Sequence, residues 1–189
     1  MDIRINLIHY PLYVLGPNKR IGIWTQGCSF ECKGCISQHT WDKDEGVLYG
    51  VEALVKEVLK SNTKRVTITG GEPFEQAVAL KELLIGLRDS GIDDILLYSG
   101  FSYRYLQQKF QDILELIDVL VVGRFEIDKP TEFVYKGSDN QEMVILNQNL
   151  KEEYMSYKKK RDRELQVINR NGIFVLGIPK IGRQIDEKV

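Results

Sequence analysis

Short apolar segments alternate with helical patterns along the first two thirds of the chain. Residues 3–8 alternate between apolar and polar positions, and a second β-rich segment over 21–24 follows the turn signal Gly16-Pro17-Asn18, so we expect an N-terminal β-hairpin. Three short apolar runs follow at 66–69, 95–98 and 119–122. Continuous apolar runs are typical of parallel strands that are covered on both faces.

Apolar residues at helical spacing separate these strands. They fall within 51–59, 80–87 and 106–117, which predicts the order β-α-β-α-β-α-β. Parallel strands joined by helical crossovers form either an open sheet or a barrel, and both architectures bind ligands at the carboxyl ends of the strands. We therefore expect an α/β fold with its site at that edge.

The pattern changes after residue 150. Residues 151–164 are dominated by charge and predict a solvated helix, whose basic run 158–163 we interpret as an exposed face rather than a binding patch. Residues 165–168 and 173–176 flank Asn171-Gly172, a strong hairpin signal. We expect the tail from Arg183 to be mobile.

Composition narrows the class of protein. The 189 residues carry 26 basic and 27 acidic side chains, so nothing suggests an electrostatic footprint for nucleic acid, and no apolar run is long enough to span a membrane. The N-terminus does not resemble a signal peptide. Three clustered cysteines argue against a disulfide framework and for metal or redox chemistry in a reducing cytoplasm.

All three cysteines lie within eight residues, as Cys28, Cys32 and Cys35. Three thiolates could bind a [4Fe–4S] cluster and leave one iron open to a substrate or cofactor. Glycine at 27 and 34 would let the backbone wrap closely around such a group, and Lys33 could offset its negative charge. The alternative is a Cys3His zinc site completed by His39.

Other candidate residues directly follow strands. Gly70-Gly71-Glu72-Pro73 combines a sharp turn with a carboxylate that could hold an ammonium group, and Pro73 could open the next helix. Ser99-Gly100 and Gly123-Arg124 follow the next two strands. Because the carboxyl ends of parallel strands share one edge, we expect these turns to meet the cysteine loop.

Together, C-x3-C-x2-C and Gly-Gly-Glu-Pro resemble the radical S-adenosylmethionine superfamily. Further segments are similar to the activating enzymes of anaerobic ribonucleotide reductase: Gly16-Pro17, Arg20, Gln26-Gly27, Thr40-Trp41, 98–101, 118–121, Gly123, Phe125, Gly137-Ser138 and Asn140-Gln141. The resemblance covers roughly residues 3–150, most of a compact domain.

The resemblance implies an incomplete, open (β/α) barrel of the radical S-adenosylmethionine type, with the N-terminal β-hairpin and a short C-terminal extension. Residues 1–150 would form the core, and residues 151–189 a helix plus β-hairpin that packs on it or flanks it. Cys28, Cys32 and Cys35 would bind [4Fe–4S], whose open iron would chelate S-adenosylmethionine.

The same resemblance assigns the remaining site residues. Gly70, Gly71 and Glu72 would hold the methionine amino group, with Pro73 completing the motif, and Ser99 with Gly100 would lie near the carboxylate or ribose. No catalytic side chain is implied, because the cluster and S-adenosylmethionine carry the radical chemistry.

The implied reaction is reductive cleavage of S-adenosylmethionine to a 5′-deoxyadenosyl radical, which takes a hydrogen atom from a glycine of a large glycyl-radical enzyme. That partner would be an anaerobic ribonucleotide reductase or a protein like it. The electron donor would be a flavodoxin or a ferredoxin-type protein.

Some residues depart from the family pattern. Ile36 follows the third cysteine where an aromatic residue or histidine is usual, and Val122 and Arg124 replace the expected Asp and the frequent Pro or Lys. The segment 136–142 has Lys136 and Glu142 where arginines are expected. The change at Glu142 indicates either a different partner or ordinary surface variation.

Two other functions stay open at this point. The first is a radical enzyme that acts on a small molecule or peptide, with the extension from residue 150 covering its pocket. The second is a zinc-stabilised interaction module, in which the strand–helix order and the Gly-Gly-Glu-Pro turn would have no role.

Overall fold

A computed structural model gives the structure of the chain and describes residues 1–169 and 172–180. Its strands are β1 (Asp2–Leu12), β2 (Arg20–Thr25), β3 (Val47–Gly50), β4 (Arg65–Gly70), β5 (Asp94–Ser99), β6 (Val119–Val122), β7 (Glu142–Ile145), β8 (Gln166–Asn169) and β9 (Ile173–Leu176). Its helices are α1 (Val51–Leu59), α2 (Ala77–Asp89), α3 (Tyr103–Lys109), α4 (Gln111–Leu114) and α5 (Lys151–Lys158). Short 3₁₀ turns cover Gln38–Thr40, Pro73–Gln76 and Gln148–Leu150.

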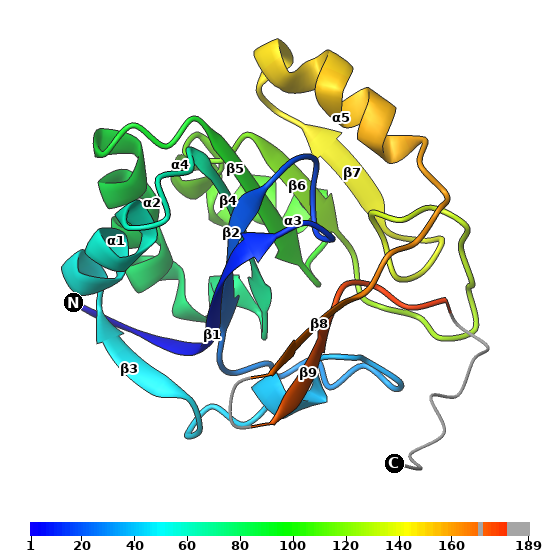
Figure 1. The fold of residues 1–189 in the computed structure, drawn as a ribbon, viewed down its shortest axis with the longest axis horizontal. Helices are drawn as coiled ribbons and strands as arrows, with labels where there is room; N and C mark the ends of the chain where they lie inside the picture. The colour runs from blue at the N-terminus through cyan, green and yellow to red at the C-terminus, as the bar shows by residue number, and fades with distance from the viewer. Residues whose placement is uncertain (170–171, 181–189) are drawn as a thin grey trace.

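Within the described residues, β1 to β7 form one open sheet in the order β3-β1-β2-β4-β5-β6-β7 (Figure 1). The central strands β2, β4, β5 and β6 are parallel, whereas β1, β3 and β7 pair antiparallel at the two sides. The predicted hairpin is confirmed, because Ile8 of β1 pairs with Ile23 of β2. The fold is thus a mixed α/β fold around a largely parallel sheet.

The two faces of the sheet bury different layers. Ile23, Ile68 and Leu97 lie on the face that packs against the first four helices, and all three are fully buried. Leu96, on the opposite face of β5, packs instead against a cluster that contains Tyr154 and Tyr157 of α5. Alternate residues of each central strand therefore meet separate layers, as expected for parallel strands covered on both sides.

The C-terminal extension covers this second face. Beside the α5 cluster, Leu176 of β9 packs with Leu12 of β1 and Trp24 of β2. Figure 1 shows the β8–β9 hairpin lying below the sheet, on the side where the segment after β2 emerges. The predicted hairpin is confirmed, whereas Asn171 and the tail from Arg183 lie outside the described residues.

A buried ion pair fixes the start of three parallel strands. The guanidinium of Arg20, which is fully buried, donates to both carboxylate oxygens of Asp94 at 2.7 and 2.9 Å and to Oγ1 of Thr67 at 2.8 Å. The Tyr154 hydroxyl donates to the same carboxylate at 2.6 Å. This cluster joins β2, β4, β5 and α5, because the Asp94 carboxylate accepts from both the Arg20 guanidinium and the Tyr154 hydroxyl.

Several elements differ from the prediction. The edge strands β3 and β7 were not predicted, because each pairs on one side only and their four-residue segments show no clean alternation. The helix expected over 106–117 divides at Phe110, whose φ of −141° is not helical. The helix expected over 151–164 ends at Lys158, since no apolar residue beyond Tyr157 continues its contact stripe.

The basic run 158–163 is largely exposed, as interpreted, but Arg163 is not. Its guanidinium donates to the carbonyls of Thr131, Phe133 and Ile178 at 2.7 to 2.9 Å. Arg163 therefore ties the extension to the segment between β6 and β7. Across the described part of the chain, no helix combines the length and the apolar character needed to cross a membrane.

We expect Asp94→Ala to destabilise the fold by about 3–5 kcal/mol, because it leaves the Arg20 guanidinium buried without its counter-charge. Urea unfolding followed by circular dichroism measures the change. The control is Asp44→Ala, which removes an exposed ion pair with Lys43 and should have no measurable effect. Equal stabilities of the two variants would contradict this role for the buried pair.

Candidate functional site

The cysteine loop leaves the sheet at the end of β2 and closes on itself. The amide of Gly27 donates to the carbonyl of Thr40 at 2.8 Å, and the amide of Cys28 donates to the carbonyl of Trp41 at 3.0 Å. The side chain of Gln26 adds a bond to the carbonyl of Asp42 at 2.7 Å. These bonds fix the base of a loop that otherwise contains only one short 3₁₀ turn.

The three cysteines are free thiols and each is partly buried. Burial raises the pKa of the Cys28 thiol to about 11, and it also raises the pKa of Cys35. In the protein alone, the thiols of Cys28 and Cys35 are therefore protonated at neutral pH. A metal that binds them must displace their protons, so its affinity rises with pH.

The thiols and the strand-end turns line one cavity of about 150 Å³. Cys28, Cys32 and Cys35 form one wall. The opposite walls come from the ends of three parallel strands: Gly70, Gly71 and Glu72 at the end of β4, Ser99 and Gly100 at the end of β5, and Gly123 directly after β6. The predicted convergence at the carboxyl edge is thus present. Pro73 is the exception, since it is buried at the start of the 3₁₀ turn behind the cavity.

A backbone contact joins the Gly70-Gly71 turn to the cysteine loop. Beyond the last β2–β4 pair, the amide of Gly71 donates to the carbonyl of Thr25 and the amide of Glu72 donates to the carbonyl of Gly27, both at 2.8 Å. A Cβ on Gly71 would lie 2.1 Å from the Gly27 oxygen. Only glycine allows this approach, which explains the residue type in physical terms.

The Glu72 carboxylate is buried and already has three donors. It accepts hydrogen bonds from the amide of Gly100 at 2.7 Å, the hydroxyl of Ser99 at 2.9 Å and the amide of Phe74 at 3.1 Å. Burial is the main cause that raises the pKa of Glu72 to about 7, and these bonds oppose the shift. The carboxylate thus joins the turns after β4 and β5 to each other.

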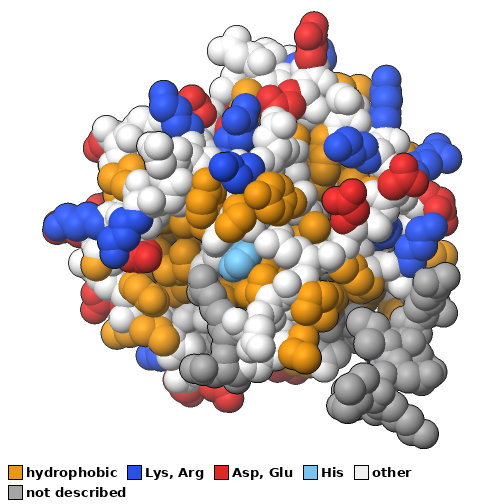
Figure 2. All heavy atoms as spheres, viewed as in Figure 1, with side chains coloured by type: hydrophobic (Ala, Val, Ile, Leu, Met, Phe, Trp, Pro, Cys, Tyr) orange, Lys and Arg blue, Asp and Glu red, His pale blue; other side chains and the backbone are white. Residues whose placement is uncertain are grey.

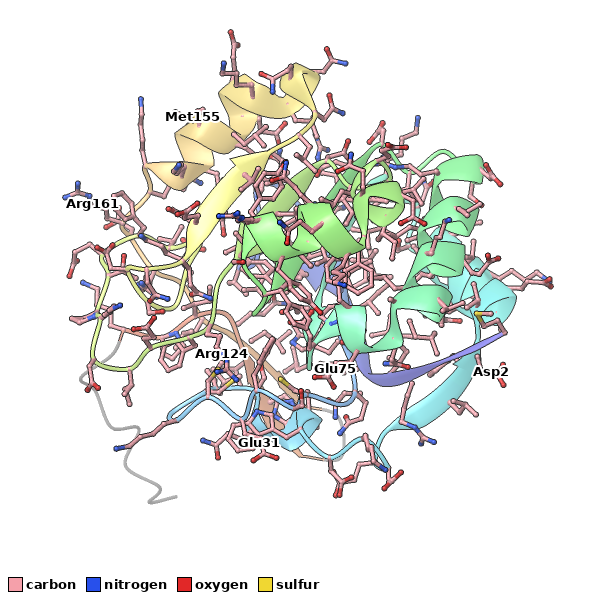
Figure 3. All side chains as sticks on the ribbon, turned by 180° about the vertical axis from the view of Figure 1, so that it is seen from behind. Asp2, Glu31, Glu75, Arg124, Met155 and Arg161 are labelled. Atoms are coloured by element: carbon pink, nitrogen blue, oxygen red, sulfur yellow. The ribbon has the colours of Figure 1, made fainter. Side chains whose placement is uncertain are left out.

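Arg124 and Ile127, which follow β6, contact the cysteine loop from the other side. The Arg124 guanidinium lies 4.5 Å from the centre of the Phe30 ring and donates to the Phe30 carbonyl at 3.4 Å. Ile127 packs so closely on Gly34 that a Cβ there would come within 2.5 Å of it. Figure 3 shows Arg124 beside the loop that carries Glu31, with Glu75 on the neighbouring side.

The segment 123–141 is held in shape by its own side chains. Gln141 accepts from the amides of Gly137 and Ser138 and donates to the carbonyl of Gly123 at 2.8 Å. Asn140 donates to the carbonyl of Arg124 at 2.8 Å. The predicted Gly137-Ser138 and Asn140-Gln141 motifs therefore order the segment that places Arg124 over the cysteine loop.

Sequence reasoning missed several of these supports. Phe30 packs against Gly100, where a Cβ would lie 2.5 Å from its ring, and its ring meets Phe101 at 4.8 Å. Glu75 accepts from both the amide and the hydroxyl of Ser29, at 2.8 and 2.6 Å. The glycines at 34 and 100 were the available signals, because each marks a place where a large side chain approaches the backbone.

The four side chains of the alternative Cys3His zinc site do not come together in the structure. His39 is exposed and lines a neighbouring cavity rather than the one formed by the three thiols. Among residues 1–169 and 172–180, no three His, Cys, Asp or Glu side chains are placed to hold a single metal ion. In a cluster, by contrast, each thiolate binds a different iron, so three thiols around one cavity fit [4Fe–4S]. Lys33 is exposed.

Comparisons with known proteins agree with this chemistry. A family model described as a 4Fe-4S single cluster domain matches residues 14–144. The anaerobic ribonucleoside-triphosphate reductase-activating protein of Enterobacteria phage T4 is 30% identical over 141 residues, which cover 71% of this chain and 89% of that protein. The protein of the same name from Vibrio cholerae is 32% identical over 145 residues, which cover 70% of this chain and 92% of the relative.

Among solved structures, QueE from Escherichia coli aligns with a TM-score of 0.42 and 23% sequence identity over 53% of each chain.

We expect Glu72→Gln to change how stability depends on pH in the cluster-free protein. Because burial raises the pKa of Glu72 from 4.5 to about 7, the folded chain holds a proton that the unfolded chain loses first, and stability falls as pH rises through this range. The loss is on the order of 3 kcal/mol and should be absent in Glu72→Gln. Denaturant unfolding between pH 4.5 and 7.5 measures it.

Glu82→Gln, an exposed carboxylate on α2, is the matched control and should keep the wild-type profile. A Glu72→Gln protein whose stability falls with pH as steeply as the wild type would disprove the buried titration.

We expect Arg124→Ala to loosen the cysteine loop without unfolding the chain. Reconstituted protein should lose its visible absorbance to a chelator about threefold faster, since an exposed cation–π pair contributes about 0.5–1 kcal/mol. Arg161→Ala is the control, because Arg161 lies over Phe133 at 5.5 Å, on the extension and away from the loop (Figure 3). Identical rates for both variants would argue against a positioning role.

Proposed function

The chain belongs to the 4Fe-4S single cluster domain family and, within it, to the anaerobic ribonucleoside-triphosphate reductase-activating proteins, and we propose that it installs a glycyl radical in a large partner enzyme. It does so as a radical S-adenosylmethionine enzyme with one [4Fe–4S] cluster. The observation that carries the proposal is the cavity in which three thiols face the carboxyl ends of three parallel strands.

The residues around this cavity take distinct roles. Cys28, Cys32 and Cys35 would bind three irons and leave the fourth open to S-adenosylmethionine. The Gly70–Glu72 turn would hold the methionine amino group, with the Glu72 carboxylate bracing the turn from behind through Ser99 and Gly100. Ser99 and Gly100 would lie near the carboxylate or ribose. Pro73 supports the turn from its buried position.

When bound, the cluster and S-adenosylmethionine supply the one-electron cleavage and hydrogen-atom transfer that the reaction needs. The chain itself binds and orients these groups. Its close-packed backbone at Gly27 and Gly71 fixes the distance between the thiols and the Gly70–Glu72 turn, and the Phe30 ring packs on Gly100. Preorganised geometry of this kind lowers the entropy that must be lost during the reaction.

We extend the proposal to the partner and the donor. The relatives are named for activating an anaerobic ribonucleoside-triphosphate reductase, which supports a glycyl-radical enzyme of that kind as the protein substrate. A flavodoxin or ferredoxin-type protein would deliver the electron. The three free thiols suit the reducing cytoplasm, where such thiols are not converted to disulfides.

We also propose that the open sheet is an incomplete (β/α) barrel of the radical S-adenosylmethionine type. Its parallel strands β2, β4, β5 and β6, with helices on the outer face and the site at the carboxyl edge, support this architecture. Residues 1–150 would form the radical-generating core, and residues 151–189 an extension packed on it.

We expect reconstituted wild-type protein to be brown and to cleave S-adenosylmethionine when reduced. The Cys32→Ala variant should be colourless and should not cleave S-adenosylmethionine, but it should keep its fold. Cluster binding depends on all three thiols, whereas the sheet is held by packing away from the loop. Visible absorbance, iron content, cleavage products and circular dichroism provide the measurements. Asp44→Ala, in the same loop but exposed, is the control. Colourless wild-type protein with stoichiometric zinc would refute the proposed function.

A further inference from the structure

The β8–β9 hairpin is anchored by polar contacts at its base over the face of the sheet that α5 also covers, opposite to the first four helices. Gln166 donates to the carbonyl of Pro11 at 2.7 Å and accepts from the amide of Tyr13 at 3.2 Å. Arg163, just before β8, donates to the carbonyl of Ile178, just after β9, at 2.9 Å. The two strands are therefore tied together at the base of the hairpin, and Gln166 ties that base to the end of β1.

A second cavity, of about 400 Å³, lies beneath this hairpin, and we call it the hairpin pocket. Trp24 of β2 contributes to the sheet wall, Phe174 to the hairpin wall and Ile36 to the cysteine-loop wall. Ser37, Thr69 and Tyr98 line both this pocket and the cavity of the thiols. A group that occupies the hairpin pocket would therefore lie next to the thiol cavity, where the cluster and S-adenosylmethionine would bind.

The walls of the hairpin pocket indicate the chemistry of its occupant. The described residues that line it include no Lys, Arg, Asp or Glu. His39 lines one side and is exposed as a residue, but partial desolvation of its imidazole lowers its pKa and favours the neutral ring. A pocket without charged walls disfavours a phosphate, a carboxylate or an ammonium group, because each would be desolvated without a partner.

The opposite face of the hairpin favours a macromolecular occupant over a small one. Val167 of β8 does not line the pocket and is 65% exposed, and Ile173 of β9, which also lines the pocket, is 78% exposed. Figure 2 shows hydrophobic side chains across the middle of the molecule in this view, with most charged side chains above them or at the rim. A small ligand in the pocket would leave these side chains in water, whereas a protein that inserts one segment could also cover them.

We propose that the hairpin pocket admits an uncharged, extended peptide segment of the protein partner and that Phe174 limits the side chain that this segment can carry next to the thiol cavity. This inference rests on the proposed function and names the part of the chain that selects its substrate. The pocket wall that contains Phe174 is formed by residues 173–178, which lie beyond the segment 14–144 that matches the family model. Selection is steric, since a glycine offers no side chain to collide with the Phe174 ring.

The test uses the two tryptophans of the chain as reporters, because Trp24 lines the hairpin pocket and Trp41 lines the thiol cavity. Full-length, cluster-loaded protein labelled with 5-fluorotryptophan is titrated with end-blocked pentaglycine and with the same peptide carrying a central leucine. Fluorine NMR, assigned with Trp24→Phe, follows each site. We expect pentaglycine to shift the Trp24 resonance saturably and the leucyl peptide to bind at least about tenfold more weakly.

Phe174→Ala should bring the two peptides to within about twofold of each other, and Phe174→Trp should weaken the binding of both. Val167→Ala is the matched control, because Val167 lies on the paired strand β8, is 65% exposed and does not line the hairpin pocket, so this variant should keep the tenfold preference. The inference is overturned by equal wild-type affinities, by the absence of a saturable shift with pentaglycine, or by a loss of preference in Val167→Ala as large as that in Phe174→Ala. Binding of a small apolar probe such as indole without peptide binding would also overturn it.

Cleavage of S-adenosylmethionine separates this inference from the proposed function. Protein that cleaves S-adenosylmethionine but does not distinguish the peptides retains the proposed function and loses only the inference. Cluster-loaded protein that selects pentaglycine through Phe174 but does not cleave S-adenosylmethionine when reduced loses the proposed function. The peptide titration reads binding rather than turnover, so neither result depends on the other.

Discussion

The site depends on the contact between the backbones of Gly27 and Gly71. Two parallel strands normally separate into different loops at the end of a sheet. Here the pairing of β2 and β4 continues past the last register pair through the bonds from Gly71 to Thr25 and from Glu72 to Gly27. The cysteine loop and the Gly70–Glu72 turn are consequently held at a fixed distance by the main chain, which no side-chain rotation can alter.

The remaining supports act on the two partners of this contact. Glu72 ties the turn after β4 to the turn after β5, and Glu75 bonds to Ser29 in the cysteine loop. From the far side, Arg124 and Ile127 hold the loop against the core. A loop with almost no regular structure thereby becomes a defined one, as groups that coordinate a metal centre require.

Much of this arrangement was predictable because parallel strands impose it. Apolar runs at 66–69, 95–98 and 119–122 indicated buried strands, and topology then placed the residues that follow them, Glu72 and Ser99 among them, at one edge. The edge strands β3 and β7 and the contact between Arg124 and Phe30 were not predictable. They depend on tertiary pairing between residues far apart in the chain, and nothing in local periodicity encodes such pairs.

The division between the two cavities separates radical generation from substrate selection. Every described residue that lines the thiol cavity lies within 28–141, inside the segment that matches the family, whereas the hairpin pocket takes one wall from residues 173–178. Ser37, Thr69 and Tyr98 belong to both. A change in the hairpin can therefore alter which segment reaches the reactive position without moving the thiols, because the backbone contact at Gly27 and Gly71 is independent of the extension.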